Sequence, residues 1–122
     1  MSCVGGAAHY PSARVDLAQV LRDTGRAEEA RRELALGAKL GQRECWLPLG
    51  NLLRDHFDDP VAAEDAYRAG IAAGDSHCHH NLGTLLLEQG DIEAAEEQFR
   101  RGAETGDRLA ERSLQDLTDD RP

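Results

Sequence analysis

Aromatic residues and long apolar runs are both scarce in this chain of 122 residues. Aromatics make up only 4% of the sequence, so a folded core has to be built mainly from leucine and alanine. Strands are enriched in β-branched and aromatic residues, so this composition favours an all-α fold. No apolar run reaches the roughly 18 residues that a membrane helix needs. The first six residues also lack the basic and apolar segments of a secretory signal.

Cysteine and lysine are scarce as well. Three cysteines without the spacing of a disulfide framework indicate reduced thiols and a cytoplasmic location. Lys39 is the only lysine, and the preference for arginine, with abundant Ala, Gly and Asp, indicates a GC-rich bacterial genome. The sequence contains no glycine-rich phosphate loop, serine nucleophile motif or carboxylate pair. It therefore predicts neither an enzyme nor a cofactor.

The chain has fewer basic than acidic residues, and the difference is unevenly distributed along the sequence. The net charge of −9 makes nucleic acids and anionic membranes poor partners. Residues 1–41 carry six basic and five acidic side chains, whereas residues 42–107 carry five and 14. The acidity therefore grows along the chain.

The chain repeats itself every 32 or 33 residues. Seven sets of equivalent positions carry this period: Leu17, Leu49, Leu82; Ala18, Gly50, Gly83; Leu21, Leu53, Leu86; Ala30, Ala63, Ala95; Leu34, Tyr67, Phe99; Gly37, Gly70, Gly102; and Gly41, Gly74, Gly106. A fixed period in this range marks a stacked array of structural repeats. Such arrays present surfaces for binding more often than they enclose catalytic clefts.

Each period contains two stretches with the apolar spacing of a helix, separated by turn signals such as Asp59-Pro60 and Gly90-Asp91. Asp59 and Asp91 are placed to cap the helices that follow them. The sequence therefore predicts helices and no strand, at about residues 12–24, 27–40, 44–55, 60–73, 77–89, 92–105 and 108–117.

Small residues recur at equivalent positions of the predicted helices. They are Ala18, Gly50 and Gly83 in the first helices, and Gly37, Gly70 and Gly102 in the second. The first set predicts that each first helix approaches its partner closely. Each glycine of the second set costs about 1 kcal/mol of helix propensity, so its recurrence indicates close helix contact, with fraying of the helix end as the alternative. The expected core includes Leu49, Leu53, Leu82 and Leu86, and the same spacing includes Leu17, Val20 and Leu21.

Six residues of the second period form a recognisable motif: Trp46, Leu49, Gly50, Leu53, Ala63 and Tyr67. This motif resembles the tetratricopeptide repeat, in which a Trp-x-x-Leu-Gly opening precedes a small residue and an aromatic. His79 stands at the tryptophan position of the third period, and Arg14 at that of the first. The glycine-rich joints are also similar to those of the related Sel1-like repeats.

The resemblance implies an α-solenoid of three antiparallel helix-pair repeats, stacked into a right-handed superhelix. The repeats are expected at residues 11–42, 43–75 and 76–107, with a capping helix at 108–117 and loosely ordered ends at 1–10 and 118–122. It also implies an adaptor or scaffold that binds a protein or peptide partner in a concave groove lined by the first helices. The family's clamp for C-terminal carboxylates is not matched, since only the asparagines agree among Val15, Gln19, Leu47, Asn51, His77 and Asn81.

Helical projection predicts the residues that line this groove. They are Val15, Gln19, Arg22, Leu47, Asn51, Arg54, His80, Thr84 and Leu87. The set mixes apolar, amide and guanidinium groups, which suits an extended peptide because amides bond its backbone and arginine bonds carboxylates. The alternative is that these are ordinary solvated helix positions.

Two other hypotheses follow from the sequence. His77 and His80 are three residues apart and share a helix face, which permits joint coordination of zinc or nickel in a metal-binding protein. No third ligand is evident from the sequence, and Glu44 on the adjacent helix is the candidate. The second hypothesis is a structural module that forms homo-oligomers, because a short array leaves apolar faces at both ends.

Overall fold

The computed structural model describes residues 11–119 of the chain, which contain α-helices, one short 3₁₀ helix and no strand. The elements are α2 (Pro11–Asp23), α3 (Ala27–Lys39), η1 (Arg43–Cys45), α4 (Trp46–Asp55), α5 (Pro60–Ala72), α6 (Cys78–Glu88), α7 (Ile92–Glu104) and α8 (Arg108–Asp119). All seven predicted helices are confirmed, with ends that differ from the prediction by one or two residues. The largest change is at residues 43–45, where η1 precedes α4.

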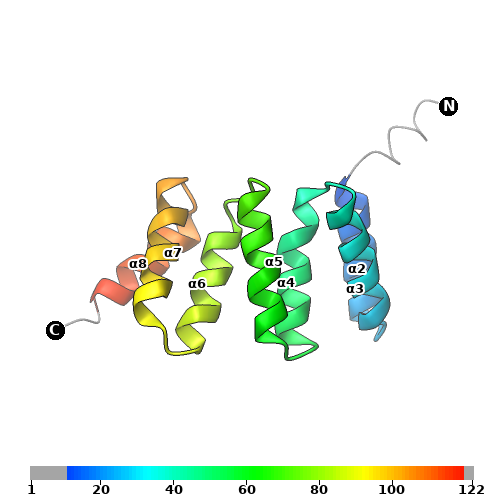
Figure 1. Ribbon diagram of the computed structural model, residues 1–122, viewed down its shortest axis with the longest axis horizontal. Helices are drawn as coiled ribbons and strands as arrows, with labels where there is room; N and C mark the ends of the chain where they lie inside the picture. The colour runs from blue at the N-terminus through cyan, green and yellow to red at the C-terminus, as the bar shows by residue number, and fades with distance from the viewer. Residues whose placement is uncertain (1–10, 120–122) are drawn as a thin grey trace.

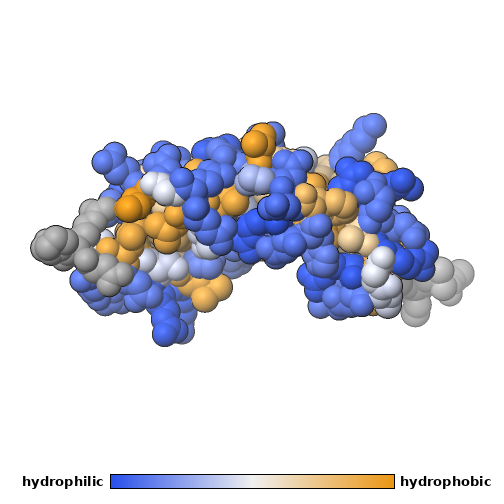
Figure 2. All heavy atoms as spheres, turned by 90° about the horizontal axis from the view of Figure 1, so that it is seen from below, coloured by the Kyte–Doolittle hydropathy of each residue, from blue (hydrophilic) through white to orange (hydrophobic). Residues whose placement is uncertain are grey.

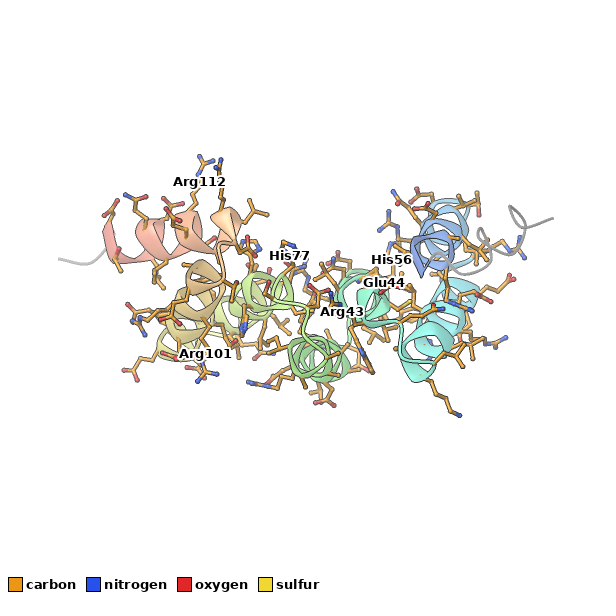
Figure 3. All side chains as sticks on the ribbon, turned by 90° about the horizontal axis from the view of Figure 1, so that it is seen from above. Arg43, Glu44, His56, His77, Arg101 and Arg112 are labelled. Carbon is orange, nitrogen blue, oxygen red and sulfur yellow. The ribbon has the colours of Figure 1, made fainter. Side chains whose placement is uncertain are left out.

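Consecutive helices pack as antiparallel pairs, α2 with α3, α4 with α5 and α6 with α7, and α8 packs on α7 (Figure 1). The chain is therefore an α-solenoid of three helix-pair repeats. A view along the helices shows α2, α4, α6 and α8 in one row and α3, α5 and α7 in the other (Figure 3). The space-filling view shows that the molecule is hollowed along one long side, between the first repeat and the C-terminal half (Figure 2).

The ends of the helices follow the turn signals in the sequence. The side chains of Asp59 and Asp91 accept hydrogen bonds from the backbone N–H groups of Ala62 and Ala94, at 3.1 and 3.2 Å. These bonds satisfy helix N–H groups that have no partner inside the helix. Gly74 at a joint has φ +100°, a conformation that a residue with a side chain rarely adopts.

Aromatic rings lie directly over two of the small residues, Gly50 and Gly83. A Cβ atom at Gly83 would lie 2.5 Å from Cε1 of Phe99, and a Cβ at Gly50 would collide with the ring of Tyr67. The rings are buried, and the leucines around them form the core of the second and third repeats. The close approach predicted from the small residues is therefore confirmed.

The second set of glycines marks contacts between successive repeats. A Cβ at Gly70 would lie 2.5 Å from Sγ of Cys78, and one at Gly102 would lie 2.6 Å from Cβ of Ala110. Each glycine faces the start of the next repeat's first helix, so these positions are contact sites and not frayed ends.

Two expectations from the sequence are wrong. Leu17 is 47% exposed, although its equivalents Leu49 and Leu82 are 6% and 0% exposed, because no preceding helix covers the first repeat within the described residues. Val20, on the next turn of the same helix, is exposed for the same reason. The C-terminal tail was expected from residue 118, but α8 continues to Asp119. The N-terminal segment 1–10 and residues 120–122 lie outside the described residues.

Candidate binding cleft between the first two repeats

The predicted groove residues lie on three helices, α2, α4 and α6, in the row that also holds α8 (Figure 3). The structure does not bring all nine into one site. Three of them, Val15, Gln19 and Arg22, line a cleft between α2 and α4. The other six lie where α4 and α6 pack directly against each other.

The cleft encloses about 150 Å³. Its remaining lining comes from Ala18, Ala30, Leu34, Pro48 and Leu52. All of these side chains are apolar, and four of the five are buried, which gives the cleft a continuous apolar floor. Gln19 and Arg22 supply the polar groups at its rim. Pro48 was not among the predicted lining residues, although a proline near the start of a first helix is a visible irregularity of the sequence.

The cleft exists because α2 and α4 make at most a marginal contact, whereas α4 packs on α6. Leu34 stands where the second and third repeats have the larger side chains of Tyr67 and Phe99. A leucine fills less of the space between two first helices than a ring does, and the unfilled volume is the cleft.

Polar bonding closes the corresponding space between the second and third repeats. Oδ1 of Asn51 accepts hydrogen bonds from the hydroxyl of Tyr67 and, at 2.6 Å, from Nδ2 of Asn81. The equivalents of Asn51 and Asn81 one repeat earlier are Gln19 and Pro48. Proline has no side-chain amide, so this bridge cannot form at the cleft.

The two arginines of the predicted groove occupy equivalent places and make equivalent ion pairs. Arg22 lies 3.1 Å from Asp23, and Arg54 lies 2.9 Å from Asp55. Each pair is partly exposed, so the arginines bring less net positive charge to the hollow side than the sequence suggested. Arg22 differs from Arg54 in lining the cleft.

The remaining predicted groove residues are partly engaged within the fold. Leu47 packs against the core of the second and third repeats, and Asn51 holds Tyr67 and Asn81. Thr84 donates a hydrogen bond to the backbone carbonyl of His80 at 3.1 Å. Leu87 is exposed, as expected for a contact surface.

The contacts of the histidines do not favour the metal hypothesis. Nδ1 of His77 lies 3.5 Å from a carboxylate oxygen of Asp107, and Nε2 of His80 lies 3.2 Å from the hydroxyl of Ser113. His77 and Glu44 come from different repeats (Figure 3). Between residues 11 and 119, no group of three His, Cys, Asp or Glu side chains is placed to hold a metal ion.

Burial makes the cysteine beside these histidines a poor nucleophile. Cys78 is fully buried, and desolvation raises the pKa of its thiol to about 12. The thiolate is the reactive form, so this side chain stays protonated at neutral pH. Burial also raises the pKa of its equivalent, Cys45.

The geometry defines a helical repeat scaffold, and comparison with known proteins agrees. The family model described as tetratricopeptide repeat matches residues 11–35 and 76–101, which lie in the first and third repeats. The match supports the tetratricopeptide repeat family, whose repeats generally mediate protein–protein interactions. A comparison with curated proteins finds no match. The similarity of the joints to Sel1-like repeats stays a prediction. None of the helices in the described range is long and apolar enough to cross a membrane.

Proposed function

We propose that the chain acts as an adaptor that binds a peptide or partner helix along its hollow side, without catalysis. The observation that carries the proposal is the cleft between α2 and α4, an apolar recess on the row of first helices. A single apolar side chain of the partner is the group that such a recess accommodates. This side chain anchors the partner, and neighbouring groups of the hollow side contact its backbone.

The chemistry of the cleft determines which side chain of the partner can bind in it. The floor of buried alanine and leucine side chains favours Leu, Ile, Val or Met, because burial contributes about 0.8 kcal/mol per methylene group. At the rim, the amide of Gln19 can both donate to and accept from an extended backbone. Arg22 can donate to a carboxylate, at the expense of its bond to Asp23. The preferred ligand is therefore an aliphatic residue next to an acidic residue or a C-terminal carboxylate.

A displayed library of random peptides tests this proposal. Selection on the purified protein should enrich sequences with one aliphatic anchor, and affinity should be measured on synthetic peptides of those sequences. Val15→Phe partly fills the cleft and should weaken binding at least tenfold. The matched control is Val61→Phe, which changes an exposed valine on α5 and should leave binding unaltered. Enrichment of peptides without an aliphatic anchor, or equal loss in both variants, would refute the cleft as the site.

A further inference from the structure

The outer side of the first repeat carries an exposed apolar surface. Leu17 and Val20 lie one turn apart on α2, and Leu36 and Leu40 lie one turn apart at the end of α3. Between the two helices is a hollow of about 430 Å³, lined by Leu17 and Leu21 and by charged side chains of α3. We call the four exposed side chains, Leu17, Val20, Leu36 and Leu40, the end face.

In the later repeats, the positions equivalent to Leu17 and Val20 are buried under a neighbouring helix. Val20 is 58% exposed, whereas its equivalents Leu52 and Leu85 are 3% and 2% exposed. In the later repeats, the second helix of the preceding repeat covers these positions, since α3 packs on α4 and α5 packs on α6. Leu17 and Val20 therefore have the side chains of a packed interface but no covering helix within the described residues.

The opposite end of the array is closed by polar residues. In the repeat register, α8 is the first helix of a fourth repeat, and its Leu114 and Leu117 pack into the core. The positions equivalent to Gly83 and Leu86 hold Gln115 and Thr118, both exposed. A head-to-tail contact would set the apolar end face against this polar surface, so it would leave polar groups without partners.

Charge also favours pairing of like ends. The first repeat carries balanced charges, whereas the rest of the chain is strongly acidic. Beside the end face, Arg26 pairs with Glu29 at 2.6 Å and Arg32 lies 3.4 Å from Glu28, so both signs are present. A half-turn between two copies can set arginines of one against glutamates of the other. A head-to-tail pairing would instead set the balanced first repeat against the acidic C-terminal part, and pairing through the C-terminal parts would bring two acidic surfaces together.

We infer that the end face is a homodimer interface, in which two copies pair through their first repeats about a two-fold axis. Leu17 and Val20 of one copy then take the covered environment that their equivalents have inside the array. The end face and the cleft lie on different sides of α2, so dimerisation leaves both clefts open and does not depend on peptide binding.

Sedimentation equilibrium on the full chain tests the inference. The wild type should have twice the mass of the 13.3 kDa chain, with an equilibrium that shifts with concentration. The Leu17→Glu, Val20→Glu variant should be a monomer with an unchanged circular dichroism spectrum. Leu109→Glu changes an equally exposed leucine on α8 and should stay dimeric. A monomeric wild type, or dissociation of both variants, would overturn the proposal.

A cysteine at the interface distinguishes the symmetric dimer from a head-to-tail chain. Cys45 and Cys78 are buried, so Cys3→Ser leaves a background for a single added thiol. In that background, Val20→Cys should oxidise to a covalent dimer, because a residue near a two-fold axis meets its own copy. Leu109→Cys should not. A covalent dimer through Leu109→Cys and none through Val20→Cys would contradict the symmetric arrangement.

Discussion

The two junctions between repeats use equivalent positions, but only in the second do the two first helices pack directly on each other. Between the second and third repeats, the ring of Tyr67 lies in a shared core with Leu82, and Asn51 bonds to Asn81. Between the first and second repeats, Leu34 takes the place of the ring, and Pro48 takes the place of the asparagine that makes the amide bond. The outcome is a packed junction in one case and a cleft of about 150 Å³ in the other.

The difference shows how a repeat array acquires an apolar cleft without a new structural element. In a solenoid, stability is approximately a sum over repeats and their nearest-neighbour junctions, so one junction can be loosened while the next holds. The second junction supplies buried rings and polar bridges. The first has few of these contacts and leaves an apolar surface for a partner.

The largest expected effect is a difference in stability between a substitution in the packed core and one at the uncovered end of the array. Leu82→Ala removes a fully buried side chain and should lower the free energy of unfolding by about 2–5 kcal/mol. Leu17→Ala changes the equivalent residue of the first repeat, which is half-exposed, and should cost less than about 1 kcal/mol in a monomer. Urea unfolding of both variants on the Val20→Glu background, which should weaken the proposed dimer, measures the difference. Equal losses would show that the repeat register is wrong.

Alkaline pH should weaken the second junction selectively. Burial raises the pKa of Tyr67 from 10.0 to about 12. Between these values the unfolded chain releases the phenol proton and the folded chain keeps it, so stability falls as pH rises from 10 to 12. The loss is on the order of 2 kcal/mol. Cys78 adds a similar loss that begins near pH 9, because its pKa is raised from 9.0 to about 12.

The variant Tyr67→Phe should remove the tyrosine part of this dependence. Urea unfolding at a series of pH values from 8 to 11 measures it, with the wild type and Tyr10→Phe as references. At neutral pH the variant should cost about 1 kcal/mol, because Asn51 loses one hydrogen bond. An unchanged slope above pH 10 would show that Tyr67 is not the buried titrating group.

The sequence was sufficient for the repeats but not for the cleft. Helix positions, capping by Asp59 and the contact of Gly83 with Phe99 follow from local spacing and side-chain size. The cleft is the space that the side chains of α2, α3 and α4 leave unfilled. It could not be predicted, because leucine at position 34 matches the apolar pattern as well as an aromatic residue does. Leu17 was wrongly expected in the core, because periodicity identifies equivalent positions but does not show which of them is covered by a preceding helix.

Supplying the missing amide should close the first junction. The double variant Gln19→Asn, Pro48→Asn places at the cleft the same pair that joins α4 and α6. One added hydrogen bond is worth about 0.5–1.5 kcal/mol, so the melting temperature should rise slightly. Binding of selected peptides should fall as α2 approaches α4. Gln19→Asn alone is the control, because Pro48 still prevents the bridge. Unaltered binding in a double variant with a raised melting temperature would move the ligand away from the cleft.

The smallest effect on stability is expected for the two equivalent arginines. Exposed ion pairs contribute about 0–1 kcal/mol, so Arg22→Ala and Arg54→Ala should both melt close to the wild type. Their effects on binding should differ, because Arg22 lines the apolar cleft between α2 and α4, whereas Arg54 lines a separate, largely polar hollow beside Asp58 and Glu88. A charge-assisted hydrogen bond to the ligand carboxylate is worth about 1.5–3 kcal/mol, so Arg22→Ala should weaken peptide binding at least tenfold. Arg54→Ala should leave it nearly unchanged.

Since the two residues share a register position and the same type of ion pair, the comparison isolates the cleft itself. Equal losses would show that the ligand spans both junctions, and a loss confined to Arg54→Ala would place the site on the packed junction.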